Sequence, residues 1–234
     1  MNKETFYEEL KKINITLTNE QKENLEKYAD LLIEYNKHTN ITAIKDKEGI
    51  YLKHFYDSLT LIKITDLNEP LTLLDVGSGG GFPGIVLKIV FPNLDITLLD
   101  SNNKKSEFQK FIIENLELKG IKVVCDRAEN YYKTGEKYDI VVARAVSSLN
   151  ILSELTIPFV KLKGEFIAMK ADAQNEIEMS KNGIKTLGGK IKDIVKFNLP
   201  IENSQRTLIK VEKVSETPNI YPRSYDKIIK KPLK

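Results

Sequence analysis

A glycine-rich segment at residues 75–84 contains the residue types that bind a nucleotide-like ligand. It reads Asp-Val-Gly-Ser-Gly-Gly-Gly-Phe-Pro-Gly, and its last six residues match the pattern G-x-G-x-x-G. Glycines let the backbone approach a ligand and adopt positive φ without a steric penalty from Cβ. Asp100 follows about 20 residues later, where its carboxylate can accept hydrogen bonds from ribose hydroxyls. Both features occur in NAD-binding and in methyl-donor folds, and a plain tight turn is a third interpretation of the glycines.

Two acidic segments favour S-adenosylmethionine over NAD as the ligand. Asp75 precedes the glycines, where it can order the turn and meet the positively charged amino acid end of the methyl donor, whereas a pyrophosphate would be repelled. The segment 126–129, Asp-Arg-Ala-Glu, can give polar contacts to an adenine edge, although acids at a helix N-terminus produce the same pattern. An NAD(P)-dependent oxidoreductase and a non-catalytic binding module with an inactive donor pocket remain as alternatives.

The segment after the fourth predicted strand, residues 142–148, bears on the methyl acceptor. It lacks the Asn/Asp-Pro-Pro-aromatic loop with which amino-group methyltransferases accept N–H hydrogens. Carbon methylation of pyrimidines requires a cysteine nucleophile, and Cys125 follows another strand and is expected to be a small core residue. What remains is a nucleophilic acceptor such as guanine N7, whose lone pair needs no general base. Proximity and in-line orientation would then supply most of the catalysis.

The composition excludes several classes of protein. The 234 residues, 41% hydrophobic and 29% charged, predict one domain with a buried core and a short accessory segment. No apolar run approaches the roughly 20 residues that cross a bilayer, and the N-terminus lacks the apolar centre of a signal peptide, so we expect a cytoplasmic protein without a membrane partner. A single cysteine argues against a disulfide and a cysteine-rich zinc site, and no metal is expected. The net charge of +3 permits a local basic surface, and the basic C-terminal end is either that surface or a solvated tail.

The elements that must position these residues change in type along the chain. Residues 1–66 are expected to form a helical extension, 67–215 the core, and 216–234 a basic tail. The core alternates strands with helices. Strands are expected at 71–76, 96–99, 121–125, 138–143, 165–169, 191–199 and 207–214, with helices near 83–91, 108–116, 149–160 and 173–187. The sequence therefore predicts an α/β, Rossmann-like class I methyltransferase fold, with a mostly parallel seven-stranded sheet and helices on both faces. Ligands of such sheets bind beyond the carboxyl ends of the strands.

Motifs along almost the whole chain resemble the RsmG family (glucose-inhibited division protein B) of bacterial methyltransferases. Lys-His-x-x-Asp-Ser-Leu at 53–59, Ala-Arg-Ala at 143–145 and Tyr-Pro-Arg at 221–223 are the most specific of them. The other matching segments are 34–42, 75–84, 98–101 with 104–105, 126–129 and 169–171. Where the family often has a tryptophan, this chain has Tyr35, which keeps an apolar surface.

The resemblance implies S-adenosylmethionine-dependent methylation of N7 of a specific guanine in bacterial 16S rRNA, by direct in-line transfer without a covalent enzyme intermediate. The partner would be 16S rRNA or a small ribosomal subunit particle, and the protein a monomer. Arg144 would act by positioning, together with His54 and Asp57, which would otherwise be a hydrogen-bonded helix-packing pair. The residues expected to bind the cofactor are Asp75, Gly77, Gly79, Phe82, Asp100, Ala128, Glu129 and Arg144. Those expected to bind RNA are Lys53, Lys104, Lys105, Arg206, Arg223, Lys230 and Lys231.

Overall fold

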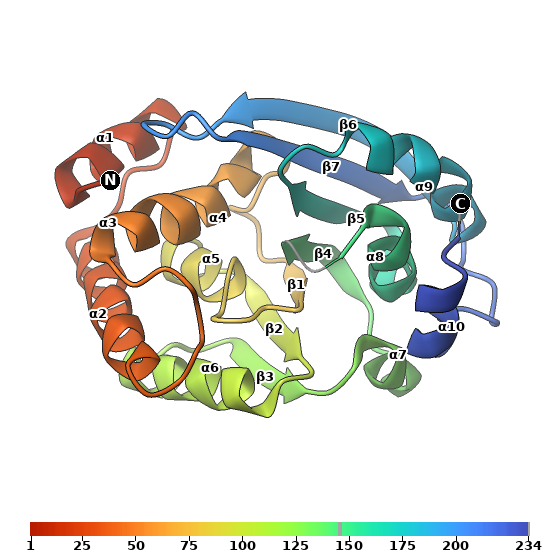
Figure 1. Ribbon diagram of the computed structural model, residues 1–234, viewed down its shortest axis with the longest axis horizontal. Helices are drawn as coiled ribbons and strands as arrows, with labels where there is room; N and C mark the ends of the chain where they lie inside the picture. The colour runs from red at the N-terminus through yellow and green to blue at the C-terminus, as the bar shows by residue number, and fades with distance from the viewer. Residues whose placement is uncertain (145–146, 234) are drawn as a thin grey trace.

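A computed structural model describes residues 1–144 and 147–233 and shows one seven-stranded sheet between two layers of helices (Figure 1). The strand order is β3-β2-β1-β4-β5-β7-β6. Neighbours from β3 to β5 are parallel, and β7 is antiparallel to both β5 and β6. The strands are β1 Thr72–Val76, β2 Asp95–Asp100, β3 Ile121–Cys125, β4 Tyr138–Arg144, β5 Val160–Lys170, β6 Gly189–Asn198 and β7 Gln205–Lys213. The predicted fold class and all seven predicted strands are confirmed.

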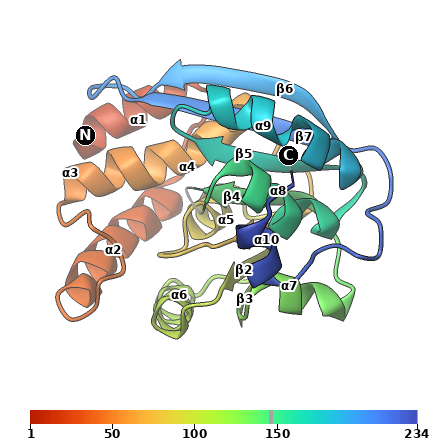
Figure 2. The ribbon, with the colours of Figure 1, turned by 45° about the vertical axis from the view of Figure 1, so that its right-hand side comes forward.

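Two hydrophobic cores lie on opposite faces of the sheet because side chains alternate along each strand. Leu73 packs on one face with the N-terminal helices, and its neighbour Leu74 packs on the other face with the C-terminal ones. The first layer contains α1 Lys3–Lys12, α2 Asn19–Asn36, α3 Lys47–Ile50, α4 Asp57–Leu59, α5 Gly84–Val90 and α6 Asn103–Asn115. The second contains α7 Ala128–Tyr131, α8 Leu149–Thr156, α9 Gln174–Thr186 and α10 Tyr225–Lys230 (Figures 1 and 2).

The strand β5 begins earlier than the sequence pattern indicated. The helix expected at 149–160 ends at Thr156, and a short 3-10 turn, Ile157–Phe159, leads into β5 at Val160. Pro158 lies in this turn and has no N–H with which to continue the helix. Tyr138 pairs with Val160, so β4 and β5 are joined over a longer stretch than expected.

The C-terminal segment packs on the protein, which contradicts its interpretation as a solvated end. It contains α10, whose Ile228 side chain is fully buried against the second core. The N-terminal helices likewise share the first core with the sheet. Among the described residues, no helix combines the length and hydropathy needed to cross a membrane.

Candidate active site

A cavity of about 730 Å³ lies at the carboxyl ends of the parallel strands. Its walls come from the glycine turn after β1, the end of β2, the loop after β3, and Arg144 at the end of β4. The chain runs outward from β1 to β3 on one side and from β4 to β5 on the other, so the cavity lies where the strand order reverses. This is the place where open α/β sheets bind their ligands.

The glycine turn has the backbone conformation that only glycine adopts readily. Gly77, Gly79 and Gly81 have φ of 72°, 58° and 89°. A Cβ on Gly81 would also overlap the Ile85 side chain. The Gly79 N–H donates to Asp100 Oδ2 at 2.8 Å, so the acid at the end of β2 holds the turn in place. Asp100 lines the cavity as well, and its role toward ribose hydroxyls stays a prediction.

Asp75 orders the glycine turn from below and does not line the cavity. Its side chain is fully buried, and Oδ2 accepts a hydrogen bond from the Gly84 N–H at 2.8 Å. Burial raises the pKa of Asp75 to about 7, although the Gly84 hydrogen bond opposes the shift. The observed role of the Asp75 carboxylate is to hold the turn, and its direct contact with the methyl donor stays a prediction.

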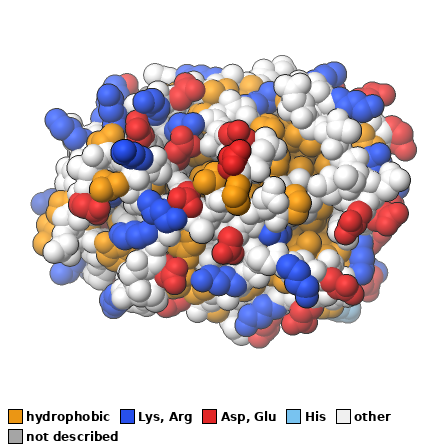
Figure 3. Space-filling model, turned by 180° about the vertical axis from the view of Figure 1, so that it is seen from behind, with side chains coloured by type: hydrophobic (Ala, Val, Ile, Leu, Met, Phe, Trp, Pro, Cys, Tyr) orange, Lys and Arg blue, Asp and Glu red, His pale blue; other side chains and the backbone are white. Residues whose placement is uncertain are grey.

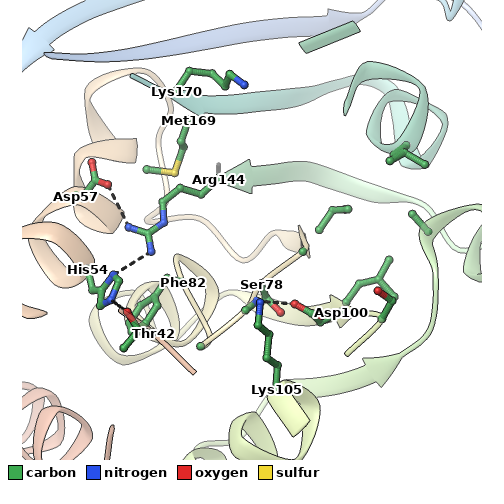
Figure 4. A pocket seen from close by; sticks show the side chains of 18 of the residues that line it. Thr42, His54, Asp57, Ser78, Phe82, Asp100, Lys105, Arg144, Met169 and Lys170 are labelled. Carbon is green, nitrogen blue, oxygen red and sulfur yellow. Dashed lines mark hydrogen bonds and ion pairs between the residues drawn. The ribbon is translucent and has the colours of Figure 1, made fainter. Parts of the chain in front are cut away.

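Arg144 joins the sheet to the N-terminal helical layer at the cavity wall (Figure 4). Its Nη1 donates to the Lys53 carbonyl oxygen at 2.7 Å and to Asp57 Oδ2 at 3.1 Å, and its Nη2 donates to His54 Nδ1 at 3.1 Å. Lys53 and His54 belong to a π-helical segment, Tyr51–Tyr56, and Asp57 begins α4. Such π turns often occur at functional sites. The structure thus brings together the three residues predicted to be catalytic.

His54 is a neutral side chain with both ring nitrogens in use. Because a guanidinium nitrogen can only donate, Nδ1 accepts from Arg144, and Nε2 carries the proton and donates to Thr42 Oγ1 at 2.8 Å. Burial, and secondly the Arg144 charge, lower the pKa of His54 to about 3. The ring stacks on Phe82 with centroids 4.1 Å apart, which fixes its plane. His54 is therefore built to orient Arg144 rather than to exchange protons near neutral pH.

Of the basic side chains predicted to bind RNA, three line the cavity and a fourth is exposed next to one of these in the sequence. Arg206, from β7, lines the cavity, and its Nε donates to Asp57 Oδ1 at 3.0 Å, so Asp57 holds two arginines. Lys53 also lines the cavity, and its Nζ lies 2.9 Å from Glu202 Oε1. Lys105 lines the cavity beside the glycine turn, and Lys104 is exposed.

The tail cations divide into two groups. Lys230 and Lys231 are exposed. Arg223 instead donates from Nε and Nη2 to the two carboxylate oxygens of Glu154, at 2.9 and 2.6 Å. Glu154 is fully buried. Arg223 thus pairs with an internal carboxylate, and its contact with RNA stays a prediction.

The loop after β3 forms the next part of the cavity wall. Ala128 and Glu129, predicted to contact the donor, line the cavity together with Asp126 and Arg127. Ala128 also begins α7, so the segment is both a helix start and a wall of the site. Cys125, just before it, is exposed rather than in the core, because β3 is the edge strand of the sheet. Ala145, the last residue of the Ala-Arg-Ala motif, lies outside the described residues.

Several lining or supporting residues were missed by sequence reasoning. Gln109 is fully buried, and its Nε2 donates to Ser78 Oγ and to the Gly79 carbonyl, both at 2.8 Å. A signal existed, since Gln109 is a polar residue beside Phe108 on the buried side of α6. Thr42, which receives the His54 hydrogen bond, and Lys170, which donates to the Ser147 carbonyl oxygen at 2.6 Å, also line the cavity. No group of three or more potential metal ligands occurs in the ranges 1–144 and 147–233.

Comparison with solved structures supports the fold. A methyltransferase from Pyrococcus furiosus superimposes with a TM-score of 0.56 at 14% identity, over 80% of this chain and 98% of that chain. Fibrillarin from Aeropyrum pernix, whose crystal structure contains natively bound S-adenosyl-L-methionine, gives 0.52 at 15% identity, over 67% of this chain and 74% of that chain. These similarities confirm the Rossmann-like methyltransferase fold.

Sequence comparison identifies the family. The model of the family described as GidB, rRNA small subunit methyltransferase G, matches residues 21–209. The ribosomal RNA small subunit methyltransferase G of Staphylococcus carnosus is 45% identical over 238 positions, covering 100% of this chain and 99% of that protein. The Bacillus thuringiensis protein of the same name is 46% identical, with 95% of each chain covered. The chain therefore belongs to the rRNA small subunit methyltransferase G family and is an S-adenosylmethionine-dependent methyltransferase.

Proposed function

We propose that this chain methylates N7 of a specific guanine in 16S rRNA of the small ribosomal subunit, by direct in-line transfer without a covalent enzyme intermediate. Family membership supports an rRNA substrate, since the relatives are named for the small-subunit rRNA. The choice of N7 rests on the hydrogen bonds made by His54 and Asp57, the two side chains that bind Arg144. His54 is neutral with both nitrogens bonded, and both oxygens of Asp57 are held by arginines.

Both ring nitrogens of His54 and both carboxylate oxygens of Asp57 already have hydrogen-bond partners. This arrangement suits a methyl acceptor that has no proton to lose. A methyl acceptor that carries a proton, such as an exocyclic amine, calls for a group that accepts it. Guanine N7 has an in-plane lone pair and no proton, so it places no such demand on the site. The cluster then contributes by holding the base in place, and orientation supplies most of the catalysis. Arg144, His54 and Asp57 are positioning residues in this proposal.

The described residues fit S-adenosylmethionine as the cofactor. The left-handed turn at Gly77 and Gly79 leaves backbone exposed to the cavity, and Asp100 faces the same space. Gly77, Gly79 and Phe82 would lie along the donor, Asp100 would face its ribose, and Ala128 and Glu129 its adenine. When bound, the cofactor supplies an electrophilic methyl group on a positively charged sulfur.

Basic side chains around the cavity support RNA as the larger substrate. Lys53, Lys105 and Arg206 line the cavity, while Lys104, Lys230 and Lys231 are exposed. These six cations would contact phosphates and make binding sensitive to salt. On the face seen from behind, basic and acidic side chains are interspersed instead of gathered by sign (Figure 3). We therefore expect RNA to approach through the cavity side.

The proposal is tested with labelled methyl donor and small-subunit rRNA transcribed either with guanosine or with 7-deazaguanosine. The deaza base replaces N7 with C–H and leaves the Watson–Crick edge unchanged, so it is a matched control for the acceptor atom. We expect methyl transfer to the normal RNA, free or assembled into a particle, and none to the deaza RNA. Equal transfer to both RNAs would show that another atom is the acceptor.

A further inference from the structure

The C-terminal helix α10 lies against the cavity at the loop that follows β3. Figures 1 and 2 both show α10 beside α7 and α8. Tyr225, the first residue of α10, lines the cavity together with Arg127, Ala128 and Glu129 from the β3–α7 segment and Leu155 from α8. The Arg127 guanidinium carbon lies 5.1 Å from the centroid of the Tyr225 ring, within the range of a cation–π contact. The tail therefore contributes an aromatic surface to this end of the site.

The tail is fixed in this position by a buried ion pair. Arg223 makes three hydrogen bonds to the Glu154 carboxylate, one from its backbone N–H at 2.8 Å and two from the guanidinium. The guanidinium also donates to the Lys231 carbonyl oxygen at 3.0 Å, which ties the two ends of α10 together. Ile228 anchors the helix in the core. Because Tyr225 lies between these anchors, its ring is held in place before any ligand binds, which lowers the entropic cost of contact.

We propose that Tyr225 forms the wall of the donor site that contacts the adenine ring of S-adenosylmethionine, so that the tail completes the cofactor pocket. The inference rests on the placement of the adenine at Ala128 and Glu129 in the proposed function. An adenine has two apolar faces and a polar edge. Leu155 and the Tyr225 ring supply the apolar contact, and Glu129 supplies an acceptor for the amino edge.

This assignment gives the basic tail a role that its charge did not indicate. The Arg223 charge is paired with Glu154, so this cation of the tail has a structural role. Tyr225, by contrast, is partly exposed, and its ring faces the cavity lining instead of lying wholly within the core. An aromatic ring in the wall of this cavity matches the use of aromatic rings as stacking surfaces for bases.

The experiment measures equilibrium binding of S-adenosylhomocysteine and of 5′-methylthioadenosine to the full-length protein by calorimetry, without RNA. Both ligands carry adenine, and the second lacks the amino acid end. We expect Tyr225→Ala to weaken both ligands by a similar factor, on the order of tenfold. Tyr225→Phe, which keeps the ring, should bind both within about twofold of the wild type. Arg127→Ala should weaken both by about two- to fivefold, because it removes the cation beside the ring.

Controls separate this result from general damage to the tail. Lys227 is an exposed residue of α10 that does not line the cavity, so Lys227→Ala should bind both ligands as the wild type does. Arg127 is more than half exposed, so its variant remains informative even where Tyr225→Ala does not fold. Wild-type affinity in the Tyr225 and Arg127 alanine variants, or weakening of S-adenosylhomocysteine alone, would overturn the inference. If the measured affinities agree with these expectations but the protein does not methylate RNA, the result counts against the proposed acceptor and not against the role of Tyr225.

Discussion

Replacing Arg144 with alanine is the most severe test of the proposal that Arg144, His54 and Asp57 position the methyl acceptor. The side chain is only 15% exposed and holds the Lys53 carbonyl, Asp57 and His54 at once. Alanine leaves the buried Asp57 carboxylate with Arg206 alone and leaves His54 Nδ1 without its donor. Breaking a buried ion pair by removing one partner costs about 3–5 kcal/mol. Because Arg206 still holds Oδ1 of Asp57, we expect the lower end, about 3 kcal/mol.

A loss of this size leaves the protein folded, since domains of this kind are stable by about 5–15 kcal/mol. Turnover should fall as well, because misplacing reacting groups by about 1 Å can lower the rate on the order of 100-fold. Arg144→Lys is the matched variant. It keeps the charge, but a single ammonium cannot reproduce the planar fork that reaches three acceptors. We expect its stability and turnover to lie between those of the alanine variant and the wild type.

The assay combines urea unfolding, calorimetric binding of S-adenosylhomocysteine and methyl transfer to small-subunit rRNA with saturating donor. Arg144→Ala should show a lower unfolding midpoint with an unchanged slope, and a turnover reduced on the order of 100-fold. Wild-type turnover in a folded Arg144→Ala protein would refute the reasoning. It would mean that the cluster supports the fold without positioning the reaction.

Three further predictions concern Gly81 in the glycine turn, Asp75 beneath the turn, and two lysines at the C-terminal end. Gly81→Ala should destabilise the protein by about 1–3 kcal/mol more than Gly135→Ala in urea unfolding, since both have positive φ but Gly135 has open space around it; equal losses would show that crowding at the turn is unimportant. Asp75 has a raised folded pKa of about 7, so its contribution to stability is complete below pH 4 and is lost as the pH rises through 7. Asp75→Asn should therefore gain stability relative to the wild type as the pH rises from about 4 to about 7, and a pH-independent difference would contradict the shift. Substituting Lys230 and Lys231 with alanine should flatten the salt dependence of RNA binding by about one to two units of log–log slope, whereas an unchanged slope would mean that both lysines are only solvated.

The fold was predictable because its signals are local. The run Leu73–Val76 before the glycines and the alternation of strands with helices up to α9 follow directly from periodicity and turn residues. The conformation of the glycine turn was also local, since positive φ at Gly77 and Gly79 requires this residue type. These features involve neighbours in sequence, and the structure bears them out.

The side-chain environments that the sequence did not predict depend on packing between residues far apart in the chain. Glu154 and Arg223 are separated by 69 positions, and the sequence around Arg223 does not indicate that its partner is a buried carboxylate. Asp57 and Arg206 are 149 positions apart, so their pairing was equally invisible. Cys125 was expected in the core because of its residue type, but the edge position of β3 exposes it. In each case, tertiary packing decided the environment of a side chain whose local pattern was ambiguous.

The sequence predicted which residues lie around the cavity better than it predicted what each of them does. His54, Asp57 and Arg144 were grouped from motifs, and the structure adds that they bind one another and Thr42. The hydrogen-bond directions, and hence the neutral state of His54, come only from geometry. That state is what favours an acceptor without a proton to lose.

Mass mapping of the modified nucleotide tests the proposed function most directly. Small-subunit rRNA lacking the modification is incubated with the protein and methyl donor, digested with nucleases, and compared with an untreated sample by tandem mass spectrometry. We expect one guanosine to gain a single methyl group, with fragment ions and lability that identify N7. A methyl group on another atom or another base, or on many guanines without preference, would contradict the proposed function.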